Sequence, residues 1–139
     1  MSLGKRRLYF HGFVFLALAP LSGFLILAPV ANQRAMLSMH LALWLSGAVM
    51  CAAGGAWPLL ATSSKTQAWS ERGLIAGMWI GLVLAGFPAF LGTSTELAGG
   101  GTAPAWAESL ERVFQIGMTI TLVPALLAIA FGLGKKRAA

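Results

Sequence analysis

Four long apolar runs, separated by short polar segments, restrict most strongly what this chain can fold into. They cover about residues 8–31, 36–61, 73–91 and 106–133. Each is close to the ~20 residues that an α-helix needs to cross a hydrocarbon core. Of the 139 residues, 58% are hydrophobic and only 10% are charged, which is too few charges for the surface of a soluble domain. We therefore predict an all-α integral membrane protein, with residues 1–139 forming one four-helix domain.

Nine of the ten Lys and Arg residues lie outside the four runs, and their distribution predicts the orientation of the chain. Lys and Arg in short loops favour the cytoplasmic side of a membrane. Most of them precede the first run, join the second to the third or follow the fourth: Lys5, Arg6, Arg7, Lys65, Arg72, Lys135, Lys136 and Arg137. We therefore expect both termini to be cytoplasmic, in a bacterial inner membrane. The net charge of +6 then serves to set the topology and attracts anionic lipid headgroups. We therefore expect no nucleic-acid partner.

His40 is the one imidazole in the second apolar run. A histidine in a membrane helix is costly unless it is paired, so it usually marks an interhelical hydrogen bond or a functional site. Gly47 lies seven residues later on nearly the same helix face, and Gly47, Cys51 and either Gly54 or Gly55 form a stripe of small residues. Such a stripe indicates either the close approach of another helix or contact with a planar cofactor.

The ligand types in the chain restrict which metal it can hold. Two histidines, one cysteine and no aspartate fall short of a zinc or di-iron ligand set, whereas one histidine is enough to hold haem iron. In an antiparallel pair of helices, His11 and His40 differ in depth by roughly 20 Å, so they cannot share one iron within a protomer. We expect His11 to form a hydrogen bond across helices.

The fourth run opens with three charged residues, Glu108, Glu111 and Arg112. Acidic residues at a helix N-terminus, with Trp106 at headgroup level, are typical of an interfacial first turn. Alternatively, Glu108 or Glu111 lines the entrance to an internal site. Both interpretations stay open.

Three stretches of the sequence carry a resemblance to known proteins: "RRLYFHGFVFLALAPLSGF", "NQRAMLSMHLALWLSGAVMCAAGGAWP" and "AGGGTAPAW". Within them, "HG" lies early in the first run, an Asn-x-Arg turn precedes the second, "LSxH" opens the second and "WP" closes it. With this pattern the chain resembles the hydroxylaminobenzene mutases, small four-helix membrane proteins to which styrene oxide isomerases are distantly similar. The resemblance covers nearly the whole chain.

The resemblance implies a cofactor, because styrene oxide isomerases carry haem b on a single histidine of the second helix. The matching residue is His40. The resemblance further implies that ferric iron acts as a Lewis acid while an aryl epoxide becomes an aldehyde, or that an arylhydroxylamine becomes an aminophenol. Both are internal rearrangements of small apolar aromatics. Four short helices enclose little volume, so a haem is better buried between protomers, and the resemblance implies a trimer.

Two further residues are candidates for the pocket by the same resemblance. The family's asparagine, six residues after the ligand histidine, is Ser46 here, and the polar side chain of the third run is Trp79. We take Ser46 and Trp79 as candidate catalytic residues, and His40, Gly47 and Cys51 as candidate cofactor contacts. Three hypotheses follow: a haem b isomerase or mutase, a haem-binding sensor or carrier without isomerase activity, and a cofactor-free protein in which the glycine stripe packs helices.

Overall fold

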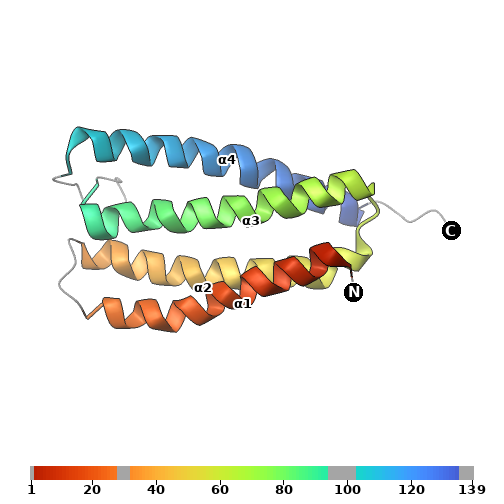
Figure 1. Ribbon diagram of the computed structural model, residues 1–139, viewed down its shortest axis with the longest axis horizontal. Helices are drawn as coiled ribbons and strands as arrows, with labels where there is room; N and C mark the ends of the chain where they lie inside the picture. Colours follow the sequence, from red (N-terminus) through yellow and green to blue (C-terminus); the bar gives the residue numbers. More distant parts are fainter. Residues whose placement is uncertain (1, 28–31, 94–102, 135–139) are drawn as a thin grey trace.

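The computed structural model describes residues 2–27, 32–93 and 103–134, which form four long helices (Figure 1). The helices are α1 (Leu3–Leu25), α2 (Gln33–Ala56), α3 (Ser64–Gly86) and α4 (Ala105–Gly134). A 3-10 turn, Trp57–Leu59, continues α2, and a π-helical turn, Phe87–Leu91, continues α3. All four are long and apolar enough to cross a membrane. The predicted all-α class is confirmed for the described residues, with four helices long and apolar enough to span a membrane.

Two helices begin well before the apolar runs from which they were predicted. α1 begins at Leu3, where Ser2 Oγ accepts a hydrogen bond from the Lys5 N–H. α3 begins at Ser64 instead of near Gly73, and Ser63 caps it by accepting from the Thr66 N–H. These caps satisfy N–H groups that have no partner within the helix. Hydropathy marks only the lipid-facing part of a helix, so it misses such polar first turns.

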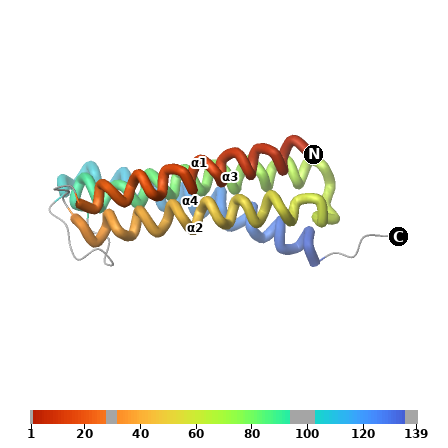
Figure 2. The backbone as a smooth tube through the Cα atoms, turned by 90° about the horizontal axis from the view of Figure 1, so that it is seen from below, coloured from red at the N-terminus to blue at the C-terminus, as the bar shows by residue number. Residues whose placement is uncertain are grey.

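The helices are arranged as two antiparallel hairpins, α1 with α2 and α3 with α4, which meet mainly between α2 and α3. In Figure 1, α4 and the α1–α2 hairpin lie on either side of α3 until α4 passes behind α3 toward its end, and Figure 2 shows α1 and α2 in front of α3 and α4. α1 and α3 begin at the end where α2 and α4 finish. The described basic residues of the predicted cytoplasmic side lie at this end: Lys5, Arg6, Arg7, Lys65 and Arg72. Lys135, Lys136 and Arg137 lie outside the described residues.

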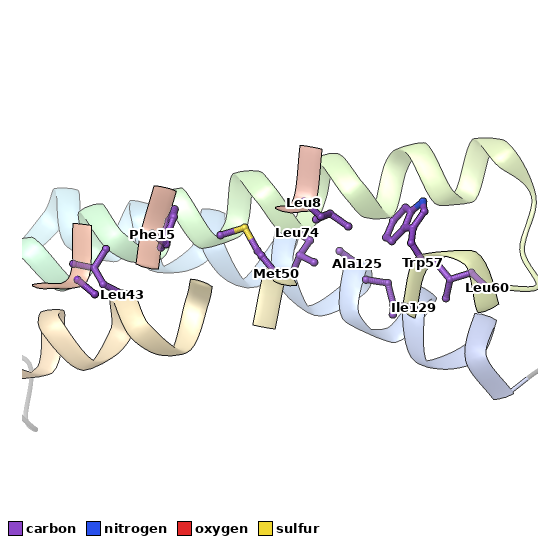
Figure 3. Close-up of a cluster of buried hydrophobic side chains, with 10 residues drawn as sticks. Leu8, Phe15, Leu43, Met50, Trp57, Leu60, Leu74, Ala125 and Ile129 are labelled. Atoms are coloured by element: carbon purple, nitrogen blue, oxygen red, sulfur yellow. The ribbon is translucent and has the colours of Figure 1, made fainter. Parts of the chain in front are cut away.

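The core runs along the middle of the bundle and takes side chains from all four helices, including Ala125 and Ile129 of α4 (Figure 3). Leu8 and Phe15 of α1, Met50 of α2 and Leu74 of α3 are fully buried there. Many other large apolar side chains point outward, as expected for helices that contact lipid. Lipid tails are as apolar as these side chains, so close packing and hydrogen bonds between helices must hold the bundle together.

α1 and α2 pack closely where Gly12 faces Gly47. A Cβ on Gly47 would lie 2.7 Å from Leu16 Cγ and 2.9 Å from the carbonyl oxygen of Gly12, and a Cβ on Gly12 would lie 2.7 Å from Cys51 Sγ. α1 therefore covers the stripe of small residues on α2. This arrangement favours the close-packing interpretation, because Gly47 and Cys51 face α1.

We expect Gly47→Ala to destabilise the protein, because the added methyl group meets a backbone carbonyl that cannot rotate away. The cost is on the order of 1–3 kcal/mol for overpacking of this kind. Gly55→Ala is the matched control, since its Cβ would meet only Tyr9 Oη, at 3.5 Å. Thermal unfolding in detergent, followed by tryptophan fluorescence, should show a lower midpoint for Gly47→Ala than for Gly55→Ala. Equal midpoints would contradict the tight contact.

Candidate functional site

The imidazole of His40 reaches from α2 to the backbone of α1. Its Nδ1 lies 2.9 Å from the carbonyl oxygen of Ala19 and 3.0 Å from Ser22 Oγ. Ser22 is buried, and its hydroxyl already donates to the same carbonyl at 2.6 Å. A carbonyl oxygen can only accept a hydrogen bond, so Nδ1 carries the hydrogen. The ring of His40 is thereby fixed in one orientation against α1.

The other ring nitrogen of His40 accepts a hydrogen bond. Trp44 Nε1 lies 3.2 Å from His40 Nε2, and an indole N–H can only donate. His40 is therefore a neutral imidazole with a lone pair on Nε2. This is the state in which histidine ligates a metal through Nε2 while a backbone carbonyl holds its Nδ1–H. Trp44 is 44% exposed, so its indole can move off Nε2 without disturbing the core.

His40 lies at the outer surface of the α1–α2 hairpin and not inside the four-helix bundle. One side of its ring packs on α1, where a Cβ on Gly23 would lie 3.4 Å from His40 Cε1. The ring itself is half-buried. The surrounding large side chains are apolar and exposed: Leu21, Phe24, Leu37, Leu41 and Trp44. The unprotonated nitrogen thus borders a surface that lipid or another apolar partner covers in a membrane.

The donor set at His40 fits a haem better than a bare metal ion. Across the described ranges, no group of three or more His, Cys, Asp or Glu side chains is placed to hold a metal ion. A porphyrin supplies its own equatorial nitrogens and needs only an axial ligand from the protein. A single imidazole, held through Nδ1 and with its Nε2 lone pair on an apolar surface, meets that need.

Trp79, a candidate catalytic residue, forms a hydrogen bond with His11. Its Nε1 lies 3.2 Å from His11 Nδ1, and its ring packs edge-on against Phe15 with centroids 4.7 Å apart. The hydrogen bond across helices that we expected of His11 is therefore present, between α1 and α3. Along α1, His11 precedes Ala19, the partner of His40, by about 12 Å of helical rise. This separation is shorter than the expected depth difference but still too long for the two histidines to share one iron.

Ser46, the other candidate catalytic residue, also leaves its helix in a different direction from His40. Ser46 leaves α2 about 120° around the helix axis from His40, given 3.6 residues per turn. On α4, Glu111 is buried and Arg112 is exposed, whereas Glu108 is half-buried. Among the described residues, one copy of the chain therefore does not gather His40, Ser46 and Trp79 around one pocket.

Sequence analysis missed the partners of His40. The contact with Trp44 could have been predicted from the sequence, because residues four apart lie on the same helix face. Ser22 and the carbonyl of Ala19 carried none, since only the register between α1 and α2 places them beside the ring.

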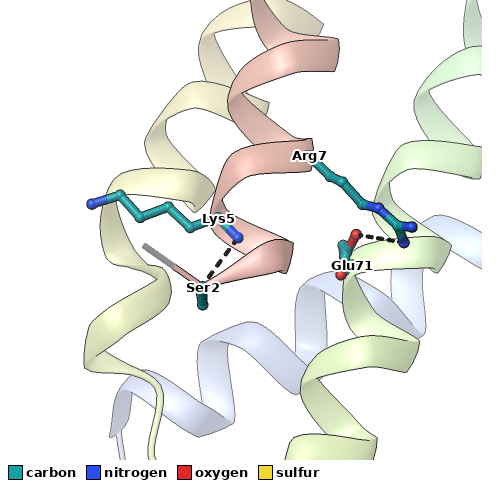
Figure 4. Close-up of polar contacts among 4 residues, drawn as sticks. All are labelled: Ser2, Lys5, Arg7 and Glu71. Atoms are coloured by element: carbon teal, nitrogen blue, oxygen red, sulfur yellow. Dashed lines mark hydrogen bonds and ion pairs between the residues drawn. The ribbon is translucent and has the colours of Figure 1, made fainter.

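An ion pair between an exposed arginine and a buried glutamate was missed as well (Figure 4). Arg7 Nη1 lies 3.5 Å from Glu71 Oε1, which links α1 to α3 at the basic end of the bundle. Glu71 is buried, and a buried carboxylate needs a compensating partner. The two residues are 64 positions apart, so only the fold could show that they meet.

Comparison with known proteins gives one match. A family model described as styrene oxide isomerase matches residues 4–134. This range covers all four helices except Leu3 and includes His40. No curated protein and no solved structure matches the chain.

We expect the two histidines to adopt opposite neutral tautomers in the haem-free protein. The acceptor beside His40 Nδ1 places its hydrogen there, whereas the Trp79 donor leaves His11 with its hydrogen on Nε2. ¹⁵N NMR of protein labelled at histidine distinguishes the tautomers, and His11→Phe assigns the signals. The same tautomer at both positions would contradict the hydrogen bonds described here.

Proposed function

The chain belongs to the styrene oxide isomerase family, and we propose that it is a membrane-bound isomerase that rearranges a small apolar aromatic at haem b held by His40. The geometry of His40 supports this proposal. The ring is neutral, its Nδ1 is fixed by Ala19 and Ser22, and its Nε2 lone pair lies at the edge of an apolar surface. His40 Nε2 would hold haem b there, and the bound haem would supply a Lewis-acidic iron for the oxygen of the substrate.

The residues around His40 orient its ring and influence the electron density on its Nε2. A hydrogen bond from Nδ1 to a carbonyl raises the electron density on Nε2 and fixes the ring plane. The Ser22 hydroxyl donates to the same carbonyl and lies 3.0 Å from Nδ1, so it helps to fix both groups. The indole N–H of Trp44 donates to His40 Nε2. When another partner binds Nε2, this indole N–H becomes free to donate beside the site. A single histidine is thereby presented in the orientation that an axial ligand needs.

The apolar surface around His40 suits the proposed substrate. An internal rearrangement needs neither a second substrate nor water, and an apolar aromatic partitions into the bilayer, where Phe24 and Leu41 would contact it. The family match favours an aryl epoxide that opens to an aldehyde over an arylhydroxylamine. We keep Ser46 and Trp79 as candidate catalytic residues only if a neighbouring copy brings them to the haem, and we propose the homotrimer that the resemblance implies.

A haem-binding sensor or carrier without isomerase activity is the second candidate. The separation of Ser46 and Trp79 from His40 within one copy favours it, because a haem carrier needs an axial ligand but no polar groups for catalysis. Turnover of substrate distinguishes the two functions.

We expect purified protein to show the Soret band of b-type haem and to isomerise styrene oxide. His40→Ala should lose the band and the activity while still inserting into the membrane, because it removes the axial ligand. His11→Ala is the matched control, since it removes the other imidazole and should retain haem. Full haem occupancy in His40→Ala would overturn the ligand assignment. A haem-loaded wild type that turns over neither aryl epoxides nor arylhydroxylamines would favour the carrier.

We propose that both termini face the cytoplasm of a bacterial inner membrane, because most of the described basic residues, Lys5, Arg6, Arg7, Lys65 and Arg72, lie at the end where α1 begins and α4 finishes. A green fluorescent protein fused to the C-terminus should therefore fluoresce, whereas alkaline phosphatase at the same position should be inactive. The reverse pattern would contradict this orientation.

A further inference from the structure

The first turns of α3 form a shallow hollow at the basic end of the bundle. The hollow has a volume of about 410 Å³ and is lined by Lys65, Thr66, Ala68, Trp69 and Arg72. Both cations are exposed, and Trp69 between them is 52% exposed. Because Trp69 lies four positions after Lys65 and three before Arg72, the three side chains share one face of the helix. Two positive charges therefore flank an exposed indole.

Hydrogen bonds hold the backbone around this hollow in place. Ser63 Oγ accepts from the Thr66 N–H at 3.2 Å and lies 2.8 Å from the Thr66 hydroxyl. The amide of Gln67 donates to the carbonyl oxygens of Leu60 and Thr62, at 3.4 and 3.2 Å. These contacts fix the start of α3 to the loop that precedes it. The hollow is therefore formed before any ligand arrives, which lowers the entropic cost of binding.

The two cations in the hollow have no acidic partner among the described residues. The ion pair at this end of the bundle joins Arg7 to Glu71, and Figure 4 shows that the Glu71 carboxylate points toward α1. Glu71 precedes Arg72 directly, but consecutive side chains leave a helix in different directions. Lys65 and Arg72 are thus available to an anion from outside the bundle.

The same face of α3 becomes apolar beyond the hollow. Ala76 and Val83 are exposed on the side of the helix that carries Arg72, since they follow it by about one and three turns. They lie about 6 Å and about 16 Å further along the helix axis. Tryptophan is typical of the headgroup level of a membrane, so Trp69 marks the boundary between the charged and the apolar part. A phospholipid has the same order, with a charged headgroup followed by acyl chains.

We propose that the hollow binds the headgroup of an anionic phospholipid, with its phosphate between Lys65 and Arg72 and its acyl chain along Ala76 and Val83. A guanidinium binds phosphate through two parallel hydrogen bonds, and an ammonium adds a point charge. The attraction between the net charge of the protein and the membrane is diffuse and screened by salt, whereas this site fixes one lipid beside α3. The site is independent of the proposed function, because it needs no haem.

Native mass spectrometry of the detergent-purified protein tests the binding. We expect phosphatidylglycerol to be retained more tightly than phosphatidylcholine. Arg72→Gln should weaken the binding of phosphatidylglycerol about tenfold, as expected for one lost hydrogen bond to a charged group. Arg6→Gln is the matched control, because it removes an exposed cation at the same end but outside the hollow. It should bind phosphatidylglycerol as wild type does.

Three results would overturn the proposal. Equal affinities for the two lipids would contradict selection of a negative headgroup. An equal effect of Arg72→Gln and Arg6→Gln would show that net charge alone holds the lipid. Displacement of phosphatidylglycerol by excess inorganic phosphate would show that the hollow binds a free anion and not a lipid.

Tryptophan fluorescence in phosphatidylcholine vesicles tests the location of the lipid. Phosphatidylglycerol with bromine near the glycerol end of its acyl chains should quench wild type more than the same fraction of equally brominated phosphatidylcholine. Trp69→Phe should abolish this excess quenching. Trp106→Phe should keep it, because Trp106 is also exposed but lies at the other end of the bundle. Excess quenching that persists in Trp69→Phe would place the lipid elsewhere and overturn the site.

Discussion

The close contact between α1 and α2 determines where this chain can hold an imidazole inside a membrane. Gly12 and Gly47 face each other in an antiparallel pair. His40 lies two helical turns before Gly47, and Ala19 lies two turns after Gly12, so the register that aligns the glycines also aligns the ring of His40 with the Ala19 carbonyl. In hydrocarbon an imidazole N–H without a partner is costly, and here the neighbouring backbone supplies one. The state of His40 is thus a consequence of helix packing.

α1 also holds the polar contacts that reach the second hairpin. Arg7 pairs with Glu71, and His11 accepts from Trp79, both on α3. These contacts hold α1 against α3, and Phe15 adds to them by packing on Trp79. The helix that orients His40 is therefore itself held in place on two faces. The Nε2 edge of His40 remains at the outer surface, where a second copy and an apolar ligand can reach it.

The sequence predicted the spans of the fold better than its contacts. Hydropathy located four membrane helices, and the cost of an unpaired histidine predicted an interhelical bond for His11. The same reasoning left the stripe at Gly47 open between two interpretations, because small residues permit both close packing and cofactor contact, and only the position of Gly12 decides between them. Ser46 and Trp79 were chosen by resemblance, which carries residue positions but not the direction in which their side chains leave the helices. Ser22 lies beside His40 only because of the register between α1 and α2, which neither helix shows by itself.

The axial bond from His40 Nε2 to haem iron is the central claim, and resonance Raman spectroscopy of the reduced, haem-loaded protein tests it most directly. We expect an iron–imidazole stretching band in wild type that disappears in His40→Gly and returns when imidazole is added to that variant. The returned band should shift when the added imidazole carries ¹⁵N. A band that persists unchanged in His40→Gly without added imidazole would contradict the account, because another group would then hold the iron.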